Sequence, residues 1–142
     1  MVKKISPLAP KSFPKIPNIK GVEIGTARSG VKYKGRNDIF TAIFDKGTSV
    51  AGVFTQSRVP AEPVTFCKKN IVDGKARALI VNAGFANAYT GAKGKKINKS
   101  ISSNVKKVLK CNEKDIFICS TGVIGEQIPL RPTNKSITQS LK

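Results

Sequence analysis

Two short apolar runs on either side of a lysine-rich amphipathic segment constrain the fold more than any other feature of this sequence. Residues 76–81 are apolar except for Arg77, and residues 116–119 form the second run. Such runs are typical of strands buried on both faces. Between them, residues 93–110 carry apolar side chains at helical spacing, which predicts an amphipathic helix. A strand, a helix and a strand in this order favour a crossover unit with parallel strands.

The sequence before this unit predicts further β structure. Residues 22–26 alternate between apolar and other residues, and residues 38–44 and 49–55 predict two strands. The turn composition of residues 45–48 would join these two strands as a hairpin. Residues 64–67 predict one more short strand, placed after two prolines. The expected fold class is therefore α/β, with a mainly mixed sheet and one clear amphipathic helix.

Two shorter features complete the expected organisation of the chain. Asp73-Gly74 predicts a tight turn before the first apolar run. Near the other end, Thr133 is expected to cap a helix whose apolar residues run to Leu141. That apolar face stops at Lys142 without a capping glycine, which favours an element cut short.

The first 19 residues differ from the rest because they hold half of the eight prolines. This spacing forbids a regular helix and favours an extended conformation. Four apolar side chains favour a docked arm over a disordered tail: Leu8, Phe13, Ile16 and Ile19. We therefore divide the chain into an extended arm, residues 1–19, and one domain, residues 20–142.

The chain is strongly basic, with 26 Lys and Arg against 8 Asp and Glu and a net charge of +18. One interpretation is a basic module that binds nucleic acid or another anion. The other is a lysine-biased composition, or a piece whose missing portion is acidic. The excess is mostly lysine, whereas sequence-specific readers of nucleic acid favour bidentate arginine. Nucleic acid is therefore not the expected partner.

Composition excludes several kinds of catalytic site. The chain has no histidine, which rules out Cys/His zinc sites and Ser-His-Asp or Cys-His centres. We expect no metal and no bound cofactor. The three cysteines, Cys67, Cys111 and Cys119, are widely spaced and suit a reducing cytoplasm, each as a small buried apolar residue. There is no signal peptide and no apolar run long enough for a membrane helix, so we expect a cytoplasmic protein.

Two loops follow the two apolar runs, at residues 82–91 and 120–126, and both are rich in small residues. Loops at strand ends are common places for functional sites. A Thr-Gly pair such as Thr121-Gly122 can offer a hydroxyl and an unhindered amide to the oxyanion that forms during acyl transfer. From spacing alone, such a segment is more often a turn, and asparagines in such loops more often tie the loop than bind a ligand.

Five segments in order resemble the ornithine acetyltransferase family, whose bifunctional members are also glutamate N-acetyltransferases. They are residues 5–11, 47–55, 74–79, 82–91 and 120–126, the last followed by Pro129. The resemblance extends through at least Leu130. It implies a layered helix–sheet–sheet–helix (αββα) architecture, of which this chain would supply the amino-terminal part.

The resemblance also implies an activity. Family members move an acetyl group from N-acetylornithine to glutamate in arginine biosynthesis, and some use acetyl-CoA as the acetyl donor. The precursor cuts itself before a threonine, which becomes the nucleophile of a second chain and forms an acetyl-threonine intermediate. The two chains assemble as an α/β heterotetramer. Thr121 and Gly122 match the family's oxyanion-hole pair.

The sequence departs from the family pattern in two ways. It ends before the region where the family keeps its substrate lysine, its Ala-Thr cleavage site and a later glutamate. It also has Phe85 where the family loop usually has asparagine. We therefore expect a chain that is inactive by itself and, with strand edges exposed, poorly soluble or partly unfolded. The alternatives are a non-catalytic basic module that binds nucleic acid and a decayed relic.

Overall fold

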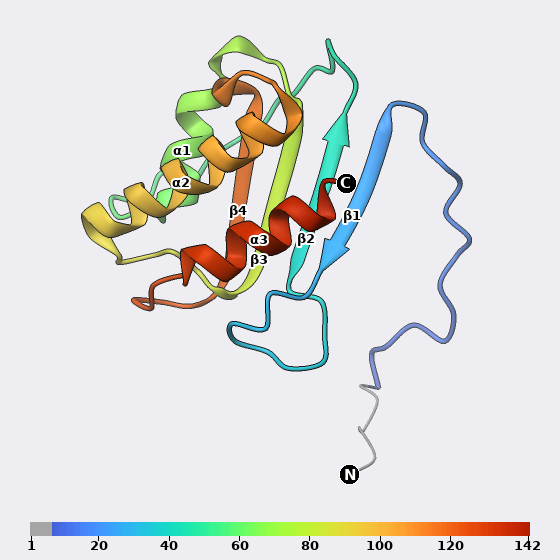
Figure 1. The fold of residues 1–142 in the computed structure, drawn as a ribbon, viewed down its shortest axis with the longest axis horizontal. Coiled ribbons are helices and arrows are strands. Elements are labelled where there is room, and N and C mark those ends of the chain that lie inside the picture. Colours follow the sequence, from blue (N-terminus) through green and yellow to red (C-terminus); the bar gives the residue numbers. More distant parts are fainter. Residues whose placement is uncertain (1–6) are drawn as a thin grey trace.

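A four-stranded sheet is the centre of the computed structural model, which describes residues 7–142 (Figure 1). The strands are β1 (Val22–Ala27), β2 (Ile39–Phe44), β3 (Ala78–Phe85) and β4 (Ile116–Val123), and they lie side by side in this order. β2 is antiparallel to both β1 and β3, whereas β3 and β4 are parallel. The predicted α/β class and mixed sheet are confirmed.

The predicted crossover unit is also confirmed. α2 (Gly91–Leu109) connects the parallel strands β3 and β4 and lies on one face of the sheet with α3 (Leu130–Ser140) (Figure 1). The apolar face of α2 is buried at Ile97, Ile101 and Val105. These side chains pack with buried residues of the sheet and of α3 in the larger hydrophobic core. Burial of this stripe, rather than intrinsic propensity, is what stabilises a lysine-rich helix.

Thr133 does not cap α3, so that prediction is wrong. The helix begins at Leu130, and Thr133 lies inside it, buried, with its hydroxyl donating to the Pro129 carbonyl at 2.8 Å. Pro132 occupies the first turn, where a missing N–H costs little because those amides have no helical partner. Pro132 is therefore compatible with a helix that begins at Leu130, about one turn before Thr133.

Residues 64–67 are helical, so the short strand predicted there is wrong. They belong to α1 (Glu62–Asn70), which has Pro63 in its first turn and buries Pro63, Cys67 and Asn70 at helical spacing. α1 lies along the outer edge of β4. The Cys67 thiol donates to the Ile118 carbonyl at 3.2 Å, and the Asn70 amide donates to the Ile116 carbonyl at 2.9 Å. The helix thereby pairs backbone groups that an edge strand would leave exposed.

The predicted hairpin of residues 38–44 and 49–55 is absent. β2 forms, but both of its edges are already paired, with β1 and with β3. Residues 49–55 instead make one isolated bridge, between Ser49 and Lys75. Val50 and Phe54 pack with Phe44, Leu79 and Phe117 in a second, smaller core. This core lies on the face of the sheet opposite α2 and α3.

Two short 3₁₀ helices, η1 (Ile71–Asp73) and η2 (Glu113–Asp115), precede β3 and β4. Gly74 ends η1 with φ of 61°, so the turn predicted at Asp73-Gly74 is confirmed. Among the cysteines, Cys67 is buried, Cys111 is half-buried and Cys119 is exposed, and all three are free thiols. The expectation of a buried residue is therefore wrong for Cys119.

The described part of the proline-rich arm, residues 7–19, is irregular and largely exposed. Residues 1–6 of the predicted arm lie outside the described residues. From residue 7 to the start of β1 the chain contains no helix or strand, and Figure 1 shows it apart from the sheet, on the outer side of β1. Phe13 is 85% exposed and Ile16 78%. Docking of the arm and the division into arm and domain both stay predictions. No helix within residues 7–142 is long and apolar enough to cross a membrane.

Candidate acyl-transfer site

Thr121 and Gly122 lie within β4, not in a loop after it. β4 continues to Val123 and β3 continues to Phe85, so both strands are longer than predicted. In the parallel register Ala83 pairs with Thr121 and Gly84 with Gly122. The carboxyl ends of the two strands therefore bring together the two small-residue segments that the sequence singled out.

Gly84 and Gly122 approach each other more closely than any other residue type would allow. Their φ values are +115° and +135°, in the region that side chains disfavour. A Cβ built on Gly122 would overlap the Gly84 carbonyl and lie 2.5 Å from the Phe85 nitrogen. Glycine is required here by space as well as by backbone conformation.

Asn82 fixes the ends of the two strands to each other. It is buried, accepts a hydrogen bond from the Ser120 hydroxyl at 2.7 Å, and donates to the Phe85 carbonyl at 2.9 Å. Beyond the strands, the Ala86 amide donates to the Val123 carbonyl at 3.0 Å. These bonds hold the backbone around Thr121 and Gly122 in one arrangement, which is the property that an oxyanion site needs.

Asn87 anchors the start of α2. It is fully buried, donates to the Gly94 carbonyl and to the Asn98 side chain, and accepts from the Thr90 hydroxyl at 2.8 Å. Both Asn82 and Asn87 therefore hydrogen-bond within the protein, as expected for residues that tie loops.

The Thr121 side chain lies on an open face of the sheet. Paired residues of a sheet point to the same face, so Thr121 shares its face with Ala83, Val81 and Phe40, opposite α2 and α3. Thr121 and Cys119 are exposed, and Ile24 on the same face is 66% exposed. Among residues 7–142, no helix packs on this end of the face.

A mostly apolar pocket of about 240 Å³ adjoins the pair on the outer edge of β4. It lies between β4 and the first turns of α1, and it reaches Ser120, the residue before Thr121. Burial raises the pKa of the Cys119 thiol in this pocket, so the neutral thiol predominates near pH 7. The lining residues are Phe54, Ala61, Pro63, Val64, Cys67, Ile118, Cys119 and Ser120.

Lys32 lies near this site, and no pattern in the sequence indicated it. Its ammonium group lies 2.5 Å from a carboxylate oxygen of Glu126 and 5.4 Å from the centre of the Phe85 ring. Its stem also fills the space beside Gly84. Lys32 is 94 residues from Glu126 in the sequence, so no local spacing could have indicated the contact. The Phe85 ring is buried beneath this lysine.

Comparison with known proteins defines the class. The model of the ArgJ family matches residues 23–142. The arginine biosynthesis bifunctional proteins ArgJ of Mesorhizobium japonicum and Brucella suis are 52% and 50% identical to this chain over 124 and 128 residues. The chain belongs to the ArgJ family, as the resemblance to ornithine acetyltransferases implied.

Solved structures agree on the fold. The chain matches the arginine biosynthesis bifunctional protein ArgJ of Bacillus halodurans with a TM-score of 0.79 and 33% identity, over 84% of this chain and 63% of that one. It matches ornithine acetyltransferase of Mycobacterium tuberculosis, solved in complex with ornithine, with a TM-score of 0.82 and 27% identity, over 86% of this chain and 66% of that one.

These matches cover most of this chain but only part of the relatives. The alignment with the Mesorhizobium protein spans 87% of this chain and 30% of that protein, and the Brucella alignment spans 90% and 31%. The chain therefore spans about 30% of the length of the curated relatives that it matches.

Proposed function

We propose that this chain is the amino-terminal part of an acetyltransferase of arginine biosynthesis, with Thr121 and Gly122 as its oxyanion-hole pair. The complete enzyme would transfer acetyl from N-acetylornithine, or from acetyl-CoA, to glutamate through an acetyl-threonine. The observation that carries the proposal is the rigid, close approach of Gly122 to Gly84 beside an exposed Thr121 hydroxyl.

The backbone of β4 supports an oxyanion role for Gly122. The amide and carbonyl of Ile118 both contact the Cys67 thiol, so they point to the outer edge of the strand. Alternation along a strand assigns the Gly122 amide to the same edge. There it would lie beside the apolar pocket that ends at Ser120, where no other strand competes for it. An amide and a hydroxyl from adjacent residues could then bind one oxyanion.

The nucleophile is proposed to come from outside these residues. Among residues 7–142, no histidine or other general base accompanies the Thr121 hydroxyl, and Thr121 has no hydrogen-bond partner for its side chain. A threonine at a chain terminus can use its own α-amine as base. We infer that a complementary segment packs on the open face around Thr121, completes a sheet–sheet layer and supplies that threonine. The family's α/β assembly, arising from autoproteolysis, is the form that we expect.

The test is complementation of acetyl transfer. The chain is assayed with N-acetylornithine and glutamate, alone and mixed with the remaining carboxy-terminal part of the Mesorhizobium relative. We expect no turnover by the chain alone and turnover by the mixture. Turnover by the chain alone would contradict an external nucleophile, and an inactive mixture that nevertheless forms a complex would favour a decayed relic.

The role of Thr121 is tested in the active mixture. Thr121→Val removes the hydroxyl and should lower kcat by about 10²–10³-fold, the usual effect of losing one oxyanion donor. Thr65→Val, at an exposed position of α1, is the matched control and should leave kcat unchanged. Equal kcat values for the two variants would remove Thr121 from the oxyanion hole.

A further inference from the structure

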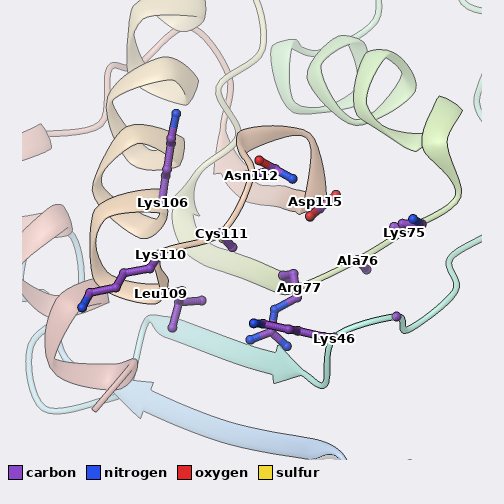
Figure 2. Close-up of a pocket in the computed structure, with 11 residues that line it drawn as sticks. Lys46, Lys75, Ala76, Arg77, Lys106, Leu109, Lys110, Cys111, Asn112 and Asp115 are labelled. Carbon is purple, nitrogen blue, oxygen red and sulfur yellow. The ribbon is translucent and has the colours of Figure 1, made fainter.

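A basic pocket lies at the opposite end of the sheet from Thr121, where β3 and β4 begin (Figure 2). Its volume is about 400 Å³, within the range of roughly 300–1,000 Å³ that is usual for small-molecule sites. Gly122 lies six positions after Ile116 in β4, so the pocket is about 20 Å from the acyl-transfer site at the rise of a strand. It is therefore a separate site.

The lining of this pocket carries five cations and one carboxylate: Lys46, Lys75, Arg77, Lys106, Lys110 and Asp115. Among residues 7–142, none of the five cations makes an ion pair, and Asp115 makes none either. Five like charges around one cavity repel one another unless an anion lies between them. Three other carboxylates of the described chain, those of Asp73, Glu113 and Glu126, are paired with lysines outside this pocket.

The floor of the pocket is built from fixed backbone. The Arg77 amide donates to the Asp115 carbonyl at 2.7 Å, and the Arg77 carbonyl accepts from the Phe44 amide at 3.0 Å. Lys75 is held by its bridge to Ser49, and the Thr48 hydroxyl donates to the Asp45 carbonyl and closes the turn that carries Lys46. Figure 2 shows the charged ends of Arg77 and Lys46 pointing toward the same part of the pocket.

The rim of the pocket is formed by two lysines from the carboxyl-terminal end of α2. Lys106 and Lys110 extend outward from the last turn of α2 and from its carboxyl-terminal cap, respectively (Figure 2). Lysines at this end of a helix are favourable without any ligand, because they offset the negative end of the helix dipole. The helix dipole does not explain the positions of Arg77, Lys46 and Lys75, because these residues lie before β3 or at its start and in the turn after β2. The inference of an anion site therefore rests on these three residues.

The Cys111 thiol lies near several of the charged groups of this pocket. Burial raises its pKa and the Asp115 carboxylate acts in the same direction, while the nearby charges of Arg77 and Lys106 lower it. Both cations therefore lie close enough to the thiol to influence it. Leu109 and Ala76 add an apolar surface beside the cations.

We propose that this pocket binds a compact anion with two or more phosphate groups, either an inorganic polyphosphate or the diphosphate of a nucleotide. Arg77 supplies the planar fork that matches two phosphate oxygens, and Lys46, whose charged end points to the same part of the pocket, supplies a point charge for a second phosphate. The rim lysines attract the anion from solution. The inference is independent of the proposed acetyl transfer.

The test is calorimetric titration of the 142-residue chain with pyrophosphate and with ADP, at about 150 mM salt so that weak surface attraction is screened. We expect saturable binding of one anion per chain. Tighter binding of ADP would identify a nucleotide as the ligand class, and equal binding would identify the inorganic anion. The same titration of the complex with the carboxy-terminal part covers the case in which the chain folds only with its complement.

Variants separate a built site from general positive charge. Arg77→Gln should weaken binding about tenfold or more, the effect of one lost charge-assisted hydrogen bond. Lys46→Gln, on an exposed turn that the fold does not need, should act in the same direction. Lys106→Gln and Lys107→Gln are a matched pair because both lysines are exposed on α2 and only Lys106 lines the pocket.

Lys106→Gln should weaken binding, and Lys107→Gln should not. The proposal is overturned if the two lysine variants behave alike, if Arg77→Gln and Lys46→Gln in folded protein bind as the wild type does, or if binding does not saturate. It is also overturned if a single-stranded RNA oligomer displaces the small anion and loses affinity equally in both lysine variants. Thr121→Val should leave this binding unchanged, which keeps the result distinct from the outcome for acetyl transfer.

Discussion

Gly122 faces Gly84 across the parallel strands β3 and β4, and the Gly84 carbonyl occupies the space that a Cβ at Gly122 would need. The contact joins the two segments around which the candidate site is built. It also shows that the strands, not a loop, hold the Thr-Gly pair in place.

Gly122→Ala should therefore destabilise the chain by about 2–4 kcal/mol, because it adds overlap to a strained φ of +135°. Gly125→Ala is the control. Gly125 also has a positive φ, +82°, but a Cβ there would meet nothing within 4 Å, so about 1–2 kcal/mol is expected. The free energy of unfolding in urea measures both. Equal losses would show that the Gly84 contact adds nothing to backbone strain.

Asn70 should be important for the outer edge of β4. Its amide donates to the Ile116 carbonyl and to the Glu113 carbonyl at 3.0 Å, and the residue is buried. Asn70→Ala removes the side-chain donor to the buried Ile116 carbonyl, whereas the Glu113 carbonyl keeps the Ile116 amide as a donor. It should lower the free energy of unfolding by about 1–3 kcal/mol. Asn37→Ala, whose amide bonds an exposed Thr26 hydroxyl, should change it by less than about 0.5 kcal/mol. Comparable losses of unfolding free energy in the two variants would show that the hydrogen bonds from Asn70 to the edge of β4 add no more stability than an exposed one.

Glu113 should make stability depend on pH in the acid range. Burial opposes its ionisation, but hydrogen bonds from Lys99 and Ser102, each 2.6 Å long, lower its pKa below the ordinary 4.5. A carboxyl whose pKa is lower in the folded state binds fewer protons there than in the unfolded chain. Its stabilisation is complete above pH 4.5 and is lost as the pH falls through the folded-state pKa.

The measurement is the thermal midpoint as a function of pH for the wild type and Glu113→Gln. The difference between them should shrink as the pH falls below 4.5. Glu23→Gln, at an exposed position of β1, is the reference for a general change of charge. A difference in thermal midpoint between the wild type and Glu113→Gln that stays constant down to low pH would contradict a lowered pKa of Glu113.

The parts of the fold that the sequence predicted are those governed by local pattern. The stripe of α2 and the apolar runs of β3 and β4 specify their own secondary structure, and their order specifies the parallel crossover. Residues 49–55 and 64–67 were misassigned because partners elsewhere decide their structure. β2 uses both edges on β1 and β3, and α1 buries Cys67 against β4.

The candidate site was predictable only in part. Thr121 and Gly122 were found by resemblance, and their exact setting depends on the register of β3 with β4, which no local spacing encodes. Lys32 and the basic pocket depend on contacts between residues that are distant in sequence, such as Arg77 with Asp115. Net charge alone left open whether the chain binds an anion, and it indicated no position for one.

Ile24 provides a test of the open face. Its side chain is 66% exposed on β1 and shares the face of Thr121, so the fold of the chain alone does not need it. Ile24→Lys should leave the folded chain intact but weaken assembly with the carboxy-terminal part at least tenfold, because a charge would be buried. Glu23→Lys places the same side chain on the opposite face of β1 and should not weaken assembly. Size-exclusion chromatography at several concentrations measures both, and equal assembly would show that the complement binds elsewhere.

Cys119 should be protected when the same face is covered. Its thiol is exposed, whereas that of Cys67 is buried and that of Cys111 lies in the basic pocket at the other end of the sheet. Burial raises the pKa of all three thiols, so alkylation by iodoacetamide is best followed above pH 8, where thiolate begins to form. In the chain alone we expect Cys119 to react fastest and Cys67 slowest. Adding the carboxy-terminal part should slow Cys119 at least tenfold and leave Cys111 unchanged, as read by mass spectrometry. An unchanged rate at Cys119 in a complex that forms would contradict packing over Thr121, because the two residues lie on the same face of β4, two positions apart.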